Sequence, residues 1–252
     1  MKYVLETKRK KVMVRMAYKI FLDPGHGGKD PGAVANELKE KDITLEISKM
    51  IRQYLLNNYA NVEVRLSRDF DAFLDLSDRA QKANTWGADI FVSIHINSGG
   101  GTGFESYVHP NASTNAIKLQ ENIHNEVIKV TSLTNRGMKR ANFAVLRLSK
   151  MPAILTENGF IDNINDANKL KDKTFLQKVA TAHAEGIARY FGLTKKQGSD
   201  ADMTKTKVLF EGKELEGFII DGKAYAEVRK LCEMLGLKVT WNAQKGIVEV
   251  SK

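Results

Sequence analysis

Four side chains that can bind a metal ion or carry a proton occur at equivalent points of the sequence pattern. His26 lies in a glycine-rich loop directly after a predicted strand, and His95 follows the apolar run of residues 90–94. Glu157 follows a short apolar stretch, and Glu40 starts a predicted helix just past the loop of His26. Ligands in open α/β sheets bind at the carboxyl ends of the strands. We therefore expect the four side chains to converge at one edge of one sheet.

Two imidazoles and one carboxylate are a common donor set for a catalytic zinc ion, which keeps one position open for water. A further carboxylate outside the metal shell could then act as general base. The only cysteine is Cys232, which excludes an intrachain disulfide and a cysteine-based zinc site. Taken singly, a loop histidine such as His26 is more often solvent-exposed than a ligand. Glu157 interrupts an apolar stretch, where a carboxylate without a partner would be costly to bury.

The elements that must position these residues alternate between strands and helices. This alternation predicts an α/β fold with a twisted, mostly parallel sheet flanked by helices. The apolar run at 90–94 is typical of a central strand that is covered on both faces. Asp75 or Ser77 is expected to cap the second helix, and Gly192 to end the last one. The predicted strands are residues 18–22, 62–66, 90–94 and 153–156, and the predicted helices are 41–57, 76–86, 113–130 and 174–191.

The chain is expected to have four parts: a basic leader (1–16), a catalytic domain (17–193), a linker (194–205) and a small α+β domain (206–252). The linker is predicted because it is polar and lacks apolar periodicity. The small domain is close to the lower size limit for independent folding. Its expected strands are 207–210, 217–225, 238–241 and 246–250, with a helix at 226–235.

The net charge of +9 does not indicate a nucleic-acid-binding face, because residues 1–22 alone carry +6. No run of 18 apolar residues is present, so no membrane span is expected. The leader lacks a clean apolar core, which argues against a secretory signal and favours synthesis in the cytoplasm. Met16 is an alternative start, which would leave residues 1–15 as an upstream extension or a disordered arm.

Four motifs, in order and spacing, closely resemble the zinc-dependent N-acetylmuramoyl-L-alanine amidases of the type-3 family. The resemblance covers about residues 17–192. The motifs are Asp-Pro-Gly-His-Gly-Gly at 23–28 with Asp-Pro-Gly-Ala at 30–33, Glu-Lys-Asp at 40–42, Ser-Ile-His-Ile-Asn at 93–97 and Glu-Asn-Gly-Phe-Ile at 157–161.

The resemblance implies a single zinc ion held by His26, Glu40 and His95, with Glu157 as the catalytic glutamate. It also implies cleavage of peptidoglycan at the amide between N-acetylmuramic acid and L-alanine. Asn97 and Asn158 are candidate hydrogen-bond donors to substrate, with loop capping as the alternative. A zinc peptidase that cuts within the stem peptide and a non-catalytic wall-binding protein are the competing hypotheses.

Residues 206–252 resemble the small repeat at the N-terminus of copper amine oxidases, which is also appended to cell-wall enzymes, most commonly in Gram-positive bacteria. Residues 194–252 contain no histidine, so no copper ligands are expected there. A wall-binding role would raise the local concentration of the enzyme at its polymer. The alternative is a spacer or dimerisation module. The layout resembles a phage endolysin that reaches the wall after holin release, with a host autolysin as the second interpretation.

The remaining polar residues of note are given structural roles. Arg79 is expected to pair with a carboxylate inside the fold, and Cys232 to be a small core residue of the C-terminal domain. Three histidines are not expected to be metal ligands: His109, His124 and His183.

Overall fold

The computed structural model describes residues 17–196, 204–210, 212–220, 223–242 and 247–251. The predicted leader therefore lies outside the described residues, as does most of the predicted linker. The chain divides into two compact units, Met1–Thr194 and Lys195–Lys252. In the part of the chain that the structure describes, no helix has the length and apolar character needed to cross a membrane.

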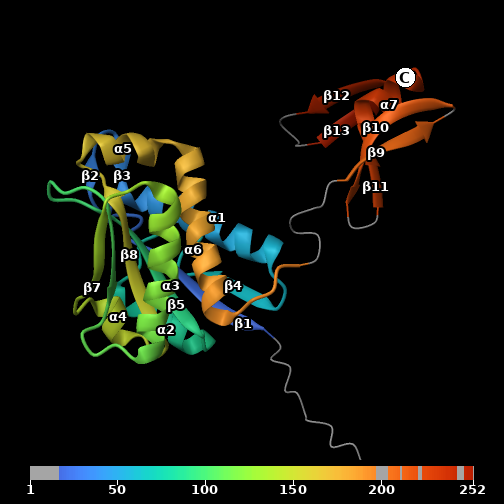
Figure 1. Cartoon of the computed structure of the whole chain (residues 1–252). Coiled ribbons are helices and arrows are strands. Elements are labelled where there is room, and N and C mark those ends of the chain that lie inside the picture. The colour runs from blue at the N-terminus through green and yellow to red at the C-terminus, as the bar shows by residue number, and fades with distance from the viewer. Residues whose placement is uncertain (1–16, 197–203, 211, 221–222, 243–246, 252) are drawn as a thin grey trace, which may run out of the picture. The chain divides into compact units, whose positions relative to one another are not determined.

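The first unit is built on a six-stranded mixed sheet with the strand order β4-β1-β5-β8-β6-β7 (Figure 1). Strands β4, β1, β5 and β8 are mutually parallel, whereas β6 runs antiparallel to β8 and β7 runs parallel to β6. Most pairs are thus parallel, as the sequence predicts. The strands are β1 (Tyr18–Pro24), β4 (Val62–Leu66), β5 (Ile90–Asn97), β6 (Phe104–Val108), β7 (Asn135–Arg140) and β8 (Ala153–Phe160).

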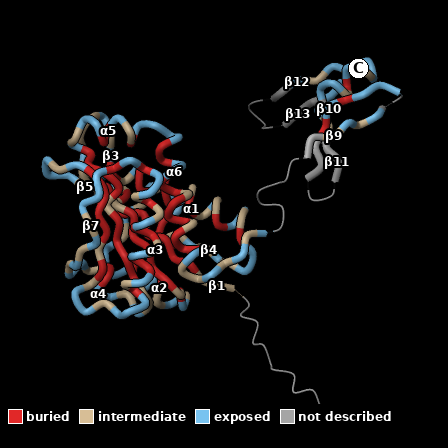
Figure 2. Tube along the Cα trace, viewed as in Figure 1, coloured by how far each residue is buried: buried red, intermediate tan, exposed pale blue. Residues whose placement is uncertain are grey.

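Helices α1 (Glu40–Asn58), α3 (Thr114–Thr131) and α6 (Lys173–Phe191) cover one face of the sheet. Their buried aliphatic side chains join those of the strands in one continuous core. The buried residues are coloured red along the chain trace in Figure 2. Burial of this apolar surface is the main source of the unit's stability. Gly192 ends α6 in the left-handed conformation, as expected.

The opposite face is covered only in part, by the shorter helices α2 (Leu76–Trp86) and α4 (Ala144–Leu148). Their core is correspondingly small and includes Phe21, Phe91 and Leu155. Since side chains alternate along a strand, His95 and Glu157 lie on this same face, closer to the carboxyl ends of their strands. The sequence predicted that β5 is covered on both faces. This holds for Ile90 to Ile94, which are all buried, whereas His95 and Asn97 near the carboxyl end are only half-buried.

Three smaller elements complete the unit near the carboxyl ends of the parallel strands. A two-stranded ribbon, β2 (Val34–Ala35) and β3 (Leu38–Lys39), leads into α1, and α5 (Ile164–Lys171) follows β8. Asp75 occupies the N-cap position of α2, but its side chain makes no capping hydrogen bond. The sequence did not predict β6, β7, α4 or α5.

The second unit contains a three-stranded antiparallel sheet, a helix and a separate hairpin. The sheet comprises β9 (Thr204–Phe210), β10 (Lys213–Ile220) and β11 (Lys223–Ala226). Helix α7 (Val228–Met234) and the hairpin of β12 (Lys238–Asn242) and β13 (Ile247–Ser251) follow. The α+β composition agrees with the prediction, except that the stretch 217–225 divides between two strands. Cys232 is buried, which confirms the small core role expected of it.

Candidate metal centre

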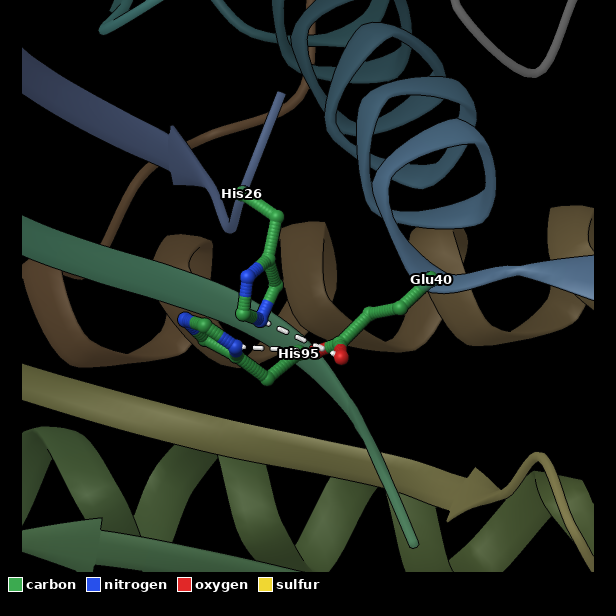
Figure 3. Close-up of side chains that lie close together, drawn as sticks. All are labelled: His26, Glu40 and His95. Atoms are coloured by element: carbon green, nitrogen blue, oxygen red, sulfur yellow. Dashed lines mark hydrogen bonds and ion pairs between the residues drawn. The ribbon is translucent and has the colours of Figure 1, made fainter. Parts of the chain in front are cut away.

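The structure brings together three of the predicted site residues: His26, Glu40 and His95 (Figure 3). His26 follows the end of β1, His95 lies near the end of β5, and Glu40 is the first residue of α1. Strands β1 and β5 are adjacent and parallel, so their carboxyl ends place the two histidines at the same edge. One donor atom from each of the three side chains lies within 4.8 Å of the others.

The two oxygens of Glu40 each face one imidazole. Nε2 of His26 lies 3.1 Å from Oε2 of Glu40, and Nδ1 of His95 lies 2.9 Å from Oε1. Both are ordinary hydrogen-bond or ion-pair distances, so the single Glu40 carboxylate holds the two imidazoles close to each other.

The backbone around the donors leaves no room for larger residues. A Cβ added to Gly25 would lie 2.4 Å from the His95 ring, and one added to Gly32 would lie 2.6 Å from Oε2 of Glu40. His26 itself adopts a positive φ of 60°, which is uncommon for a residue with a side chain. Arg79 stabilises this turn, since its Nη2 donates to the His26 carbonyl at 2.7 Å. Such close packing fixes the two rings before any ligand arrives.

Arg79 also forms an almost completely buried ion pair with Asp23, at 3.0 Å. This confirms the prediction that Arg79 pairs with a carboxylate inside the fold. A second buried arginine, Arg68, donates to the carbonyls of Pro24 and Gly25. The loop that carries His26 is therefore bound on its inner side by two guanidinium groups.

A shell of hydrogen bonds orients the three candidate ligands. Nδ1 of His26 is 2.8 Å from Oδ2 of Asp30, and the backbone amides of Ala33 and Ile96 donate to Glu40. Carboxylate partners of this kind fix the ring orientation of metal-binding histidines. Burial alone would raise the pKa of Glu40, but hydrogen bonds with His26 and His95 outweigh it and hold that pKa well below its ordinary value.

Glu157 stands beside this group on the next strand, in register with His95 on β5 and with Glu105 on β6. Its Oε2 is buried and has no hydrogen-bond partner within the described residues. Burial raises the pKa of Glu157 well above the ordinary value, and the charges of Glu40 and Glu105 add to the effect. An unpartnered buried carboxylate oxygen is costly, so its presence beside the candidate metal donors points to a functional role.

Glu105 is a neighbour of the site that was not among the predicted site residues. It is only 3% exposed and accepts hydrogen bonds from Asn97, Tyr107 and Arg136, and also from Lys139. Burial would raise the pKa of Glu105, but these donors outweigh it and lower the pKa to about 2. The carboxylate is therefore a fixed negative charge.

The two asparagines that were candidate substrate donors have different surroundings. Asn97 is half-buried, donates to Oε1 of Glu105 at 2.7 Å and accepts from the Ser98 amide. Asn158 is fully buried and donates to the His95 carbonyl at 3.0 Å, which ties β8 to β5. Substrate binding by either residue stays a prediction.

The other histidines lie apart from this group. His124 is buried between Ser106 and Asn135, and His183 is buried against the Val179 carbonyl and Thr156. His109 contacts Asn142 near the surface. Within the described residues, the only group of His, Cys, Asp and Glu side chains spaced to hold a metal ion is that of His26, Glu40 and His95.

An α/β sheet with a His-Glu-His group at its carboxyl edge and an adjacent buried glutamate is an arrangement typical of metallohydrolases. Comparison with known proteins gives the particular family. Residues 20–189 match the N-acetylmuramoyl-L-alanine amidase family, and the chain belongs to that family. It is therefore an N-acetylmuramoyl-L-alanine amidase, which hydrolyses the amide between the N-acetylmuramoyl group and L-alanine in peptidoglycan.

Individual relatives agree with this assignment. The sporulation-specific N-acetylmuramoyl-L-alanine amidase of Bacillus subtilis is 54% identical over 181 residues, which cover 72% of this chain and 71% of that protein. The endolysin of Bacillus phage SPP1 is 46% identical over 217 residues, covering 81% and 80% of the two chains. The crystal structure of an amidase from Clostridium difficile 630 superposes with a TM-score of 0.68 at 33% identity, covering 70% of this chain and 98% of that one.

Proposed function

We propose that this amidase uses one zinc ion, bound by His26, Glu40 and His95, and that Glu157 is its catalytic acid and base. The observation that carries the proposal is the spacing of the three donors, which lie around a common point within 4.8 Å of one another. Two nitrogens and one carboxylate suit zinc and leave a coordination position open. Zinc in such a site lowers the pKa of water to about 7 and polarises a carbonyl group.

Glu157 performs the proton transfers in this mechanism. Its unpartnered oxygen takes a proton from the attacking water while the water oxygen bonds to the scissile carbonyl carbon. Glu157 then gives that proton to the amide nitrogen as the carbon–nitrogen bond breaks. The products are the muramoyl carboxylic acid and a peptide with a free L-alanine amine, and Glu157 returns to its starting state.

The protein's remaining contribution is orientation. Asp30 holds the His26 ring, and two backbone amides hold the Glu40 carboxylate, so the three donors need little rearrangement to accept an ion. Donors that are already held in place lose less conformational freedom when a ligand binds. The two imidazoles remain partly exposed, His26 at 25% and His95 at 18% of the side chain.

The substitution Glu157→Gln tests the division of roles. It removes the proton acceptor and keeps the shape, so we expect amidase activity to fall about 10²- to 10⁴-fold while bound zinc stays at one per chain. His95→Ala should lose both zinc and activity. Zinc content by mass spectrometry and release of soluble wall peptides measure the two effects. Full activity of the glutamine variant would contradict the role of Glu157, and full zinc content of His95→Ala would contradict the ligand set.

We further propose that the protein acts on the bacterial wall as an endolysin, with the second unit as a wall-binding module. The similarity to the phage endolysin supports this, because it covers 81% of the chain and so extends beyond residues 17–193. The similarity to the sporulation-specific amidase favours an autolysin as the second candidate. Binding of residues 195–252, fused to an inert carrier, to purified Gram-positive walls tests the module. Failure of the fusion to sediment with any wall would contradict it.

A further inference from the structure

The strand β7 carries two cations at the border of the site, Arg136 and Lys139. The register places residues 136 and 137 opposite Glu105 on β6, and Glu105 in turn lies opposite Glu157 on β8. A bulge in the β6–β7 pairing allows both cations to reach the same carboxylate. Two positive charges thus meet one negative charge, which leaves the β7 side of the site with a net charge of +1.

Arg136 is held in a defined orientation with its outer edge free. Its Nε donates to Oε2 of Glu105 at 2.8 Å, and its guanidinium lies 4.8 Å from the ring centre of the buried Phe160. The side chain is 34% exposed. Its Nη1 and Nη2 groups form no hydrogen bond with any residue that the structure describes. A guanidinium fixed in this way presents two parallel donors, which match the two oxygens of a carboxylate.

The distance from the reacting centre suits a peptide. Adjacent strands are about 4.8 Å apart, so β7 lies about 10 Å from Glu157 on β8. An extended peptide advances about 3.3–3.6 Å per residue, so 10 Å corresponds to the second or third residue beyond the scissile amide.

We propose that Arg136 is a specificity-determining residue, which binds a free carboxylate on the second or third residue of the stem peptide. The inference rests on the proposed function, because it requires the scissile amide to lie at Glu157. Lys139 supports the site by sharing Glu105, so that the Arg136 charge is not fully neutralised. The preferred substrate class is accordingly a stem peptide whose carboxylates near L-alanine are ionised, and amidated stem peptides are poorer substrates.

Synthetic N-acetylmuramoyl tripeptides with free or amidated carboxylates on residues two and three test the preference. We expect kcat/KM to fall about 10- to 100-fold on full amidation, mainly through KM, since hydrogen bonds between charged groups are the stronger class. Arg136→Gln should reduce the ratio between the two substrates to below about threefold, and Arg136→Lys should give an intermediate ratio. The matched control is Arg140→Gln, on the same strand but bonded to the Pro110 carbonyl, which should keep the full ratio.

A binding measurement separates this proposal from the proposed function. The product peptides, with free or amidated carboxylates, are titrated into zinc-free protein and followed by nuclear magnetic resonance. Tighter binding of the free-carboxylate peptide, lost in Arg136→Gln and kept in Arg140→Gln, supports the subsite even if no substrate is cleaved. Equal binding of both peptides to the unaltered protein, or an unchanged preference in Arg136→Gln, overturns it. Cleavage of the fully amidated substrate at the muramoyl amide supports the proposed function regardless of the subsite.

Discussion

The glycine at position 25 leaves space for the ring of His95, and the substitution Gly25→Ala fills that space directly. The added Cβ would lie 2.4 Å from Cε1 and 2.6 Å from Nε2 of His95. Ordinary contacts between such atoms begin at about 3.4 Å, so the ring must move by about 1 Å. Gly25 does not require a positive φ, so alanine fits the backbone there and the change acts mainly on the ring.

A shift of 1 Å exceeds the tolerance of about 0.2 Å on zinc–nitrogen distances. We therefore expect Gly25→Ala to lose at least 100-fold in kcat/KM on purified peptidoglycan and to bind zinc much more weakly. Zinc content, competition with a chelating dye and the rate of wall solubilisation measure the effect.

The matched control is Gly186→Ala, which creates an equally close contact far from the site. Gly186 on α6 packs against α3, where the new Cβ would lie 2.6 Å from Cα of Ile123. This variant should lose about 1–3 kcal/mol of stability by overpacking but retain its zinc. If Gly25→Ala keeps wild-type zinc affinity and activity while it folds normally, the position of the His95 ring does not control the metal centre.

Three further outcomes are expected. Asp30→Asn should weaken zinc affinity about 10- to 100-fold, measured by chelator competition, because the His26 ring loses its carboxylate partner; unchanged affinity would refute that role. Arg79→Met should cost about 3–5 kcal/mol in urea unfolding, because it leaves Asp23 buried without its cation, and a loss below 1 kcal/mol would contradict this. Burial lowers the pKa of His183 to about 4, so between pH 6.5 and pH 4 the unfolded chain binds more protons than the folded one. The free energy of unfolding should therefore fall by up to about 3 kcal/mol as the pH drops through this range. His183→Gln should flatten this pH dependence, and an unaltered pH dependence would assign it to other groups.

The sequence predicts the centre of the site well because its signals are local. An apolar run followed by His95, and a glycine-rich turn around His26, place both side chains at strand ends without knowledge of the remaining fold. Glu157 is found for the same reason, since it follows an apolar stretch. Glu40 depends only on the start of a helix with clear 3.6-residue periodicity.

The border of the site could not be predicted in this way. Arg136 lies on an edge strand whose sequence, NRGMKR, has no alternation of apolar residues, and a bulge changes its register with β6. Glu105 lies on a strand that runs against its neighbour β8, and the direction of a strand depends on long-range pairing rather than on its own residues. Buried polar partners of this kind become visible only when the chain is folded.

The most direct test of the central claim is a digestion of purified peptidoglycan by zinc-free protein, before and after addition of one equivalent of zinc, with the soluble products identified by mass spectrometry. The proposed centre predicts no release without zinc and, with zinc, stem peptides that begin with a free L-alanine amine. Undiminished release of those peptides by the zinc-free protein would contradict the metal centre. Zinc-dependent release of fragments cut elsewhere in the stem peptide would contradict the assigned bond.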